Sequence, residues 1–304
     1  MKIKSKNKKY VFLGDTDSIN IEIIIKSHNF LKNKIKFIII CDKIEIVNYL
    51  KKIKSNLKIN EILDPINFHN YKIKYLNIFN VENKYKKKYK NLLDQLHISN
   101  KLSKATGYDL ITMPIDKAVF KKNINFIGVT EYLGKINKKN TFMLMQGENF
   151  SVIPLTTHIN LKEIHKNLLK NNIKKQLRNI LQLLDKNKLR YHYIKFLCYN
   201  PHCGEDNTIG REDSLISNLI NKNFKNIQGP FPADSAFIDI KKKTLFISTY
   251  HDQALVPFKI LNKKGINFTL GLNYRRLSPA HGTAKDIKYK NMSNNSSFLK
   301  CMLS

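Results

Sequence analysis

The chain has 304 residues, of which 42% are hydrophobic, so it can bury one large core or two ordinary domains and is not a disordered protein. No stretch approaches eighteen consecutive apolar residues, and we therefore expect no membrane-spanning helix. The basic start, MKIKSKNKKYVFLGD, lacks the apolar segment and the small-residue cleavage site of a signal peptide. We accordingly expect a cytoplasmic protein.

The formal net charge is +31, because the chain contains 54 lysine and arginine residues but only 23 aspartate and glutamate residues. Such a charge is typical of nucleic-acid-binding proteins. The codon usage of an AT-rich genome is the alternative origin of such a charge, and it would explain why lysine, asparagine and isoleucine are abundant along the whole chain. The lysines do not gather beside aromatic residues. We therefore favour codon usage as the origin of the charge, with attraction of a small anionic substrate as its consequence, and we expect no nucleic-acid partner.

Four cysteines occur in the chain, and none shows the CxxC spacing of a redox or zinc motif. Cys41 and Cys198 lie within apolar runs. This pattern favours reduced, buried thiols, as in a cytosolic protein.

Six short apolar runs predict strands: YVFLG, IKFIIIC, YDLITM, FSVIPL, YIKFLCY and TLFIS, in chain order. Each is a continuous block of β-branched and aromatic residues, which is typical of parallel strands buried on both faces. Residues 160–184 predict one amphipathic helix between two of these strands, with Asn160 as its N-cap. Alternation of strands and helices predicts an α/β protein with largely parallel sheets. We expect the polar tail after Asp286 to be frayed, without a final helix.

Three histidines follow predicted strands. His158 closes FSVIPLTTH, His202 closes YIKFLCYNPH, and His251 follows TLFISTY. Open α/β sheets bind ligands at the carboxyl ends of their strands. Imidazole is a common ligand of divalent transition metals, and three protein ligands leave coordination positions open for a substrate. The pattern fits a metal site and also fits three separate structural histidines. Asp252 and Asp234 (in GPFPADS) are further candidates.

Phosphate recognition is the second theme. The chain contains neither GxGxxG nor GxxxxGK[ST], so the usual dinucleotide and P-loop fingerprints are absent. Thr130, in IGVTEYLG, supplies a hydroxyl. Lys259, Asn267 and Arg276 follow the third histidine, and a guanidinium and an ammonium near a metal suit a substrate that carries carboxylate and phosphate groups.

Several segments together resemble one enzyme family. They are MPIDKAVF, GVTEYLG, TTHINLKEI, NPHCGE, GPFPADSAF, YHDQALVPFK, INFTLGL and HGTAKD. Their order and approximate spacing are similar to those of 4-hydroxythreonine-4-phosphate dehydrogenase, an enzyme of pyridoxal phosphate biosynthesis. The resemblance extends from about Tyr108 to Asp286.

The resemblance implies an isocitrate/isopropylmalate dehydrogenase-like fold with two α/β/α domains and a cleft between them. We expect the first domain to comprise residues 1–127 with 277–304, and the second to comprise residues 128–276 and to carry the metal histidines. The family works as a homodimer whose metal site is shared at the interface.

The implied reaction is the oxidation of 4-phosphooxy-L-threonine by NAD, with NADP as the alternative cofactor, followed by decarboxylation to 3-amino-2-oxopropyl phosphate. One divalent cation (Zn, Mg, Mn or Co) is implied at His158, His202 and His251. The implied substrate-binding residues are Thr130, Lys259, Asn267 and Arg276. The implied catalytic residues are Asp252 and Asp234. The residues that bind the cofactor stay unassigned.

The chemistry requires a group that takes the proton of the substrate hydroxyl. Asp252 is the first candidate, and orientation of a metal-bound histidine is its alternative role. The chain departs from the family pattern at its amino-terminal loop, GDTDSINIE, at Val129 and at Ala280. These departures keep open a sister reaction on another phosphorylated hydroxy acid, such as a four-carbon sugar acid.

Overall fold

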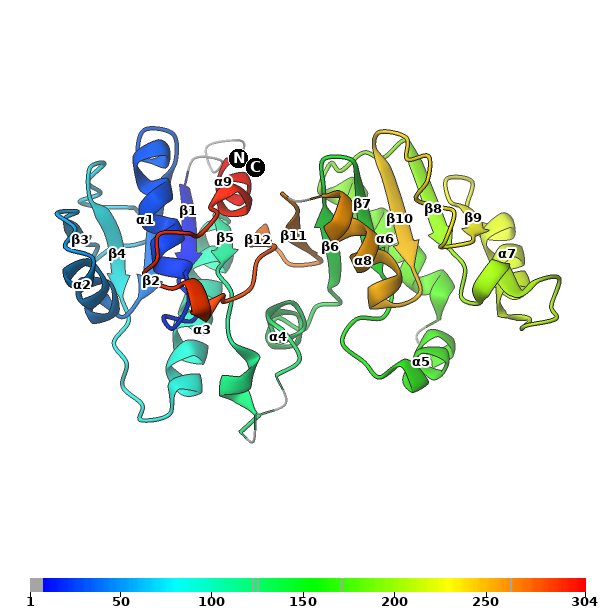
Figure 1. Cartoon of the computed structure of the whole chain (residues 1–304), viewed down its shortest axis with the longest axis horizontal. Coiled ribbons are helices and arrows are strands. Elements are labelled where there is room, and N and C mark those ends of the chain that lie inside the picture. The colour runs from blue at the N-terminus through cyan, green and yellow to red at the C-terminus, as the bar shows by residue number, and fades with distance from the viewer. Residues whose placement is uncertain (1–7, 122, 125, 171, 263) are drawn as a thin grey trace. The chain divides into compact units, whose positions relative to one another are not determined.

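The computed structural model describes residues 8–121, 123, 124, 126–170, 172–262 and 264–304 (Figure 1). The chain forms two compact units: residues 1–137 with 272–304 make unit 1, and residues 138–271 make unit 2. Unit 1 is thus built from two separate parts of the chain. It includes residues 128–137 and 272–276, which the sequence assigned to the second domain. That the units are also independent domains stays a prediction.

Unit 1 alternates strands and helices. Its elements are β1 (Lys8–Phe12), α1 (Asn20–Leu31), β2 (Lys36–Cys41), α2 (Lys43–Lys52), β3 (Ile59–Glu61), β4 (Leu76–Asn80), α3 (Lys88–Thr106), β5 (Asp109–Thr112), η1 (Lys117–Phe120), α4 (Val129–Ile136), β12 (Arg276–Pro279), η4 (Lys285–Ile287) and α9 (Ser296–Leu303). The strands lie in the order β3-β4-β2-β1-β5-β12, and every neighbouring pair is parallel.

The central strand of unit 1 explains why its apolar run is continuous. Tyr10 and Phe12 pack with Leu92 and Leu96 of α3. Val11 between them is also fully buried, and because side chains alternate along a strand it faces the opposite side of the sheet. Both faces of β1 are therefore covered, as in other parallel sheets.

Unit 2 has a mixed sheet. Its elements are β6 (Phe142–Gln146), β7 (Phe150–Pro154), η2 (Leu161–Glu163), α5 (Ile164–Lys170), α6 (Ile173–Lys186), β8 (Tyr193–Leu197), η3 (Pro201–Gly204), α7 (Glu212–Asn223), β9 (Gln228–Phe231), β10 (Thr244–Ser248), α8 (His251–Leu261) and β11 (Ile266–Leu270). The strand order is β11-β6-β7-β10-β8-β9. The pairs β11/β6 and β6/β7 are antiparallel, whereas β7, β10, β8 and β9 run parallel.

The predicted α/β class with largely parallel strands is confirmed, and all six apolar runs are strands. Two predictions of local structure are wrong. The single helix at 160–184 is a short turn, η2, followed by the two helices α5 and α6; Asn172 adopts the left-handed conformation (φ 49°) and its side chain caps α6 at Lys175. The tail is not frayed, because α9 buries Phe298, Cys301 and Met302.

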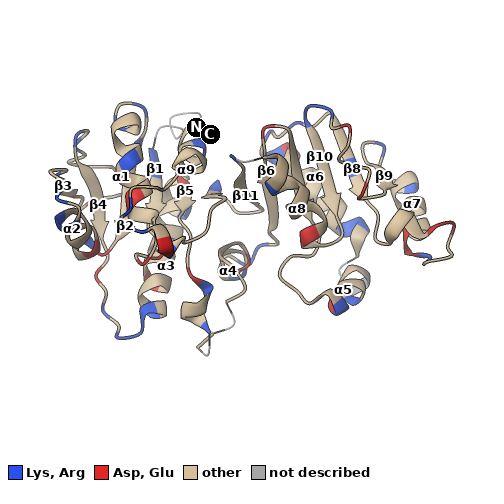
Figure 2. Ribbon diagram, in the orientation of Figure 1, with Lys and Arg blue, Asp and Glu red and all other residues tan. Residues whose placement is uncertain are grey.

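The distribution of charged residues, the hydropathy of the helices and the state of the cysteines agree with what the sequence predicted. Figure 2 shows lysine and arginine on helices and loops of both units, and they are not gathered on one of them. Within the described ranges, no helix is long and apolar enough to cross a membrane. All four cysteines are free, and Cys41 and Cys198 are buried, as the sequence predicted.

A substitution of Phe298 can test whether α9 is docked on unit 1, because the side chain of Phe298 is fully buried. Replacing it with alanine removes buried apolar contacts and leaves a cavity, so Phe298→Ala should lower the free energy of unfolding by about 3–5 kcal/mol. Leu303→Ala in the same helix is the matched control, because Leu303 is 48% exposed, and it should cost less than about 0.5 kcal/mol. Equal effects in urea denaturation would contradict a docked α9.

Candidate functional site

The carboxyl ends of three parallel strands in unit 2 are tied together by side chains. Thr156, just after β7, donates its hydroxyl to the carbonyl of Thr249, just after β10, at 2.7 Å. Gln253 donates its amide N–H to the carbonyl of Cys198, just after β8, at 2.6 Å, and accepts the backbone N–H of Thr249 at 3.0 Å. Since the strand order is β7-β10-β8, these bonds hold three neighbouring strand ends in fixed register.

One of the predicted histidines follows each of these three strand ends within a few residues. His158 and His251 lie side by side, with their ring centroids 5.4 Å apart. His251 is the first residue of α8, and its Nδ1 contacts Asp252 Oδ1 at 2.6 Å. Asp252 is exposed. A carboxylate on Nδ1 fixes the tautomer of the ring and leaves Nε2 to bind a metal.

His202 occupies a turn with unusual backbone geometry. It lies in η3 with φ 48°, and Cys203 and Gly204 after it also have positive φ. The buried carboxylate of Asp213 supports the start of this turn by accepting the backbone N–H groups of Tyr199 and Asn200, at 2.6 and 2.9 Å. Left-handed residues cost free energy, and they cluster at functional sites.

A pocket joins His202 to another predicted residue. His202 and Asp234 line it together with Tyr250 and Gln253, which flank His251 and Asp252 in the sequence. Both Asp234 and His202 are exposed. The pocket therefore lies where the ends of β8 and β10 meet.

All three histidines have side chains that can coordinate a metal, and two of them, His158 and His251, are also close enough to each other to share one. Among the residues that the structure describes, no three His, Cys, Asp or Glu side chains are close enough together to hold a metal ion. The chain thus brings His158 and His251 together and does not bring His202 into the same group. An imidazole pair with a carboxylate behind one ring is a suitable donor set for a divalent cation, and it would need a third ligand.

Arg276 and Thr130 meet in unit 1. Arg276, the first residue of β12, is only 3% exposed. Its Nη1 donates to Thr130 Oγ1 at 3.0 Å, and its Nε donates to Thr112 Oγ1 at 2.8 Å. Burial lowers the pKa of Arg276 to about 10, although Tyr274 and Glu131 act in the opposite direction. The guanidinium therefore stays charged at neutral pH.

The other two predicted substrate residues lie in unit 2. Lys259 is exposed on α8, and it follows Asp252 by seven residues, so both lie on one face of the helix. Asn267 lies on β11. Its side-chain oxygen is buried and has no hydrogen-bond partner within the described part of the chain, which makes it a candidate acceptor for a ligand N–H group.

The departures from the family pattern lie in unit 1. Val129 begins α4 and packs against the core next to α3, so it is held by apolar contacts. The Ala280 backbone N–H donates to Ser297 Oγ at 2.8 Å. In the amino-terminal loop, Lys88 contacts the buried Asp15 at 2.6 Å, and Gly14 has φ 72° with no room for a side chain.

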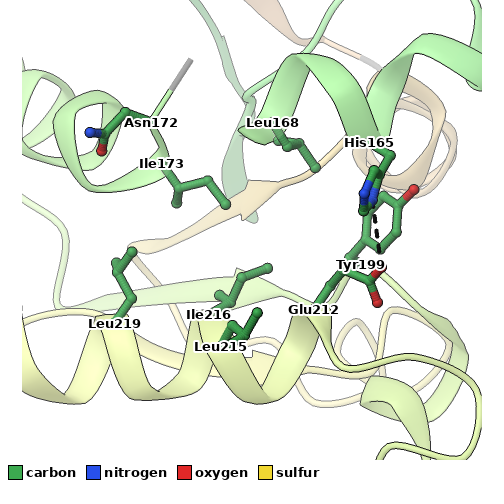
Figure 3. A pocket seen from close by; sticks show the side chains of 9 residues that line it. All are labelled: His165, Leu168, Asn172, Ile173, Tyr199, Glu212, Leu215, Ile216 and Leu219. Atoms are coloured by element: carbon green, nitrogen blue, oxygen red, sulfur yellow. Dashed lines mark ion pairs between the residues drawn. The ribbon is translucent and has the colours of Figure 1, made fainter. Parts of the chain in front are cut away.

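Two further pockets were not predicted. In unit 1, Gly14, Glu45, Asn83, Lys86 and Lys88 line a polar pocket at the carboxyl ends of β1, β2 and β4. In unit 2, α5, α6 and α7 enclose an apolar pocket, where aliphatic side chains face one another and the ion pair of His165 with Glu212 lies at one end (Figure 3).

Sequence reasoning missed Thr112, Gln253 and Thr156. Each is a polar residue at or just beyond the carboxyl end of a strand or at the start of the helix that follows, and each is held by bonds to a neighbouring segment. Their position at strand ends was readable, but their partners depend on the order of the strands in the sheet.

Known proteins resemble the chain over almost its full length. A family model described as pyridoxal phosphate biosynthetic protein PdxA matches residues 19–303. The 4-hydroxythreonine-4-phosphate dehydrogenase of Aquifex aeolicus (strain VF5) is 34% identical over 312 residues, which cover 97% of each chain. The enzyme of the same name from Hydrogenobaculum sp. (strain Y04AAS1) is 42% identical over 186 residues, 60% of each chain.

Solved structures agree in fold. The 4-hydroxythreonine-4-phosphate dehydrogenase of Klebsiella pneumoniae superposes with a TM-score of 0.80 at 22% identity, covering 98% of this chain and all of that one. The enzyme of Burkholderia phymatum gives a TM-score of 0.72 at 22% identity, covering 98% of this chain and 96% of that one. These two likenesses show the fold alone. With the family model and the Aquifex relative, however, the conclusion is plain: the chain belongs to the pyridoxal phosphate biosynthetic protein PdxA family.

Proposed function

We propose that the chain is a metal-dependent dehydrogenase that oxidises 4-phosphooxy-L-threonine with NAD, and that the product then loses carbon dioxide to give 3-amino-2-oxopropyl phosphate. Membership of the family supports an oxidoreductase of pyridoxal phosphate biosynthesis. One observation carries the proposal: His158 lies beside His251, whose ring contacts Asp252. The bond from Gln253 to Cys198 also holds the end of β8, which precedes His202, next to these residues. Neither a sister substrate nor nucleic-acid binding is favoured by the relatives. A cytoplasmic location stays a prediction.

His158, His202 and His251 would hold the divalent cation; zinc, magnesium, manganese and cobalt all remain compatible with it. When bound, such a cation favours ionisation of a coordinated hydroxyl and stabilises negative charge that develops on oxygen. Asp252 fixes the ring of His251, and its 2.6 Å contact supports this orienting role over that of general base. Asp234, which lines the pocket with His202, is the other carboxylate that could take the hydroxyl proton.

The substrate-binding residues have complementary chemistry. Arg276 and Lys259 supply positive charge for the phosphate and carboxylate groups, and Thr130 supplies a hydroxyl. The buried oxygen of Asn267 would accept an N–H bond from the amino group of the substrate. These contacts lie away from the reacting carbon and would contribute binding energy and orientation.

We propose the polar pocket of unit 1 for part of the nicotinamide cofactor. The pocket lies at the carboxyl ends of three neighbouring parallel strands, which is the usual ligand position in open α/β sheets. Lys86 could contact a cofactor phosphate, and Glu45 could accept bonds from ribose hydroxyls.

We also propose a homodimer that shares the metal site. Val256 and Ile260 of α8 are 55% and 68% exposed, and because they are four residues apart they form one apolar face of the helix. Exposed apolar patches of this kind mark protein interfaces. Because the described residues of one chain group only two of the histidines, a second copy seated on α8 could supply the third.

Activity is tested with purified protein, NAD and 4-phosphooxy-L-threonine, by following NADH absorbance after chelation and then after addition of each divalent metal. Turnover should vanish with the chelator and return with metal. His202→Ala should lower metal affinity or turnover by about 10–100-fold or more, while the exposed His69→Ala in unit 1 serves as the control. Full activity of His202→Ala would refute the metal assignment.

Asp252→Asn separates the two roles of this carboxylate. Asparagine keeps an acceptor oxygen but removes the negative charge beside His251, which should weaken metal binding about 10–100-fold, and excess metal should restore kcat. A kcat that stays low at saturating metal, with unchanged metal affinity by titration calorimetry, would instead identify Asp252 as the general base.

Ile260→Glu tests the proposed dimer face. A charge on this face should shift the mass measured by light scattering from dimer to monomer and weaken metal binding with it. Leu63→Glu is the control, because Leu63 is 83% exposed in unit 1 and should leave the mass unchanged. A mutant Ile260→Glu that stays dimeric would exclude this face.

A further inference from the structure

The buried guanidinium of Arg276 donates two hydrogen bonds to a residue that no motif singled out. Thr112 is the last residue of β5 and is fully buried. Its hydroxyl oxygen accepts two N–H bonds from Arg276, one from Nε at 2.8 Å and one from Nη2. Thr130 accepts a bond from Nη1 at 3.0 Å. Two hydroxyls on two different elements thus define the plane of the guanidinium.

The sheet makes Thr112 a rigid support. In the parallel pairing of β5 with β12, Arg276 lies opposite Leu110, so Thr112 two residues on faces the same side of the sheet. The carbonyl of Thr112 accepts the hydroxyl of Ser278 at 2.9 Å, which fixes its backbone to β12. A β-branched side chain also has few rotamers. The hydroxyl of Thr112 therefore cannot follow Arg276 if the guanidinium moves.

The low exposure of Arg276 makes its orientation decisive. At 3% exposure, only a small part of the guanidinium can reach a ligand, and a modest rotation of the side chain would withdraw it. Bidentate recognition of an anion depends on the plane in which the N–H groups lie. The acceptors at Thr112 and Thr130 are neutral oxygens, and the carboxylate whose charge acts on Arg276 is Glu131.

We propose that Thr112 is a positioning residue, whose hydroxyl fixes the guanidinium of Arg276 so that Arg276 and Thr130 can bind an anionic group of the substrate. The inference rests on the proposed function, because it requires that Arg276 contacts the substrate. It adds the strand end of β5 to the residues that determine affinity, although Thr112 itself need not touch the ligand.

The test is steady-state kinetics of Thr112→Val, which keeps the shape of the side chain and removes the hydroxyl. The KM for 4-phosphooxy-L-threonine should rise about 10–100-fold, because bonds to a charged group are lost, while kcat and the KM for NAD change less than about threefold. Thr112→Ser keeps the oxygen and should lie within about threefold of the wild type. A merely structural role would not raise one KM alone and be rescued by serine.

Inorganic phosphate as a competitive inhibitor shows which anionic group is involved. If its inhibition constant rises with the KM in Thr112→Val, Arg276 binds the phosphate; if only the KM rises, Arg276 binds the carboxylate. Both results support the positioning role. Should Thr112→Val fail to fold by circular dichroism, Thr112→Ala removes the same hydroxyl and is measured in its place.

Two results would overturn the inference, and they differ in what else they affect. An unchanged substrate KM in folded Thr112→Val, with a raised KM in Arg276→Lys, would refute the role of Thr112 and leave the proposed function standing. A wild-type enzyme without metal-dependent NADH formation would refute the proposed function, and the inference would fall with it.

Discussion

The candidate site depends on how the ends of neighbouring parallel strands are held to one another. Thr156 and Gln253 tie the ends of β7 and β8 to the end of β10, and His158, His202 and His251 follow those three ends. A strand end exposes backbone groups that must find partners. Here side chains satisfy them, and the same bonds set the starting points of the loops that carry the histidines. Loss of either tie would move two histidines relative to each other.

Unit 1 uses a related arrangement with a different purpose. Arg276 spans from β12 to the end of β5 and to α4, where Thr112 and Thr130 accept its N–H groups. A second layer supports α4: Asn100 of α3 accepts bonds from Asn137 and from the buried hydroxyl of Tyr274. Burying a charge costs free energy unless it is well hydrogen-bonded, so such networks are retained where orientation matters. In both units, buried polar groups at strand ends orient the residues that would meet a ligand.

Sequence reasoning succeeded where one pattern determines the structure and failed where register decides. Runs such as IKFIIIC predicted strands correctly, because a short, nearly continuous run of β-branched and aromatic residues is typical of a strand covered on both faces. The strands β3, β4, β6, β9, β11 and β12 were missed; in β9 (QGPF) and β12 (RLSP), glycine, proline and polar residues conceal a short strand that pairs with a neighbour. The break before α6 depends on Asn172 in a left-handed conformation, which no periodicity reveals. The histidines were readable as strand-end residues, but the approach of His158 to His251 required the order of the strands.

Diffraction from crystals grown with cobalt, recorded at its absorption edge, tests directly whether these histidines bind a metal. We expect an anomalous peak about 2.0–2.1 Å from imidazole nitrogens of His158 and His251, with His202 of the same chain or of a second copy as the third ligand. A peak that contacts none of these histidines, in crystals of catalytically active protein, would contradict a metal site at His158, His202 and His251.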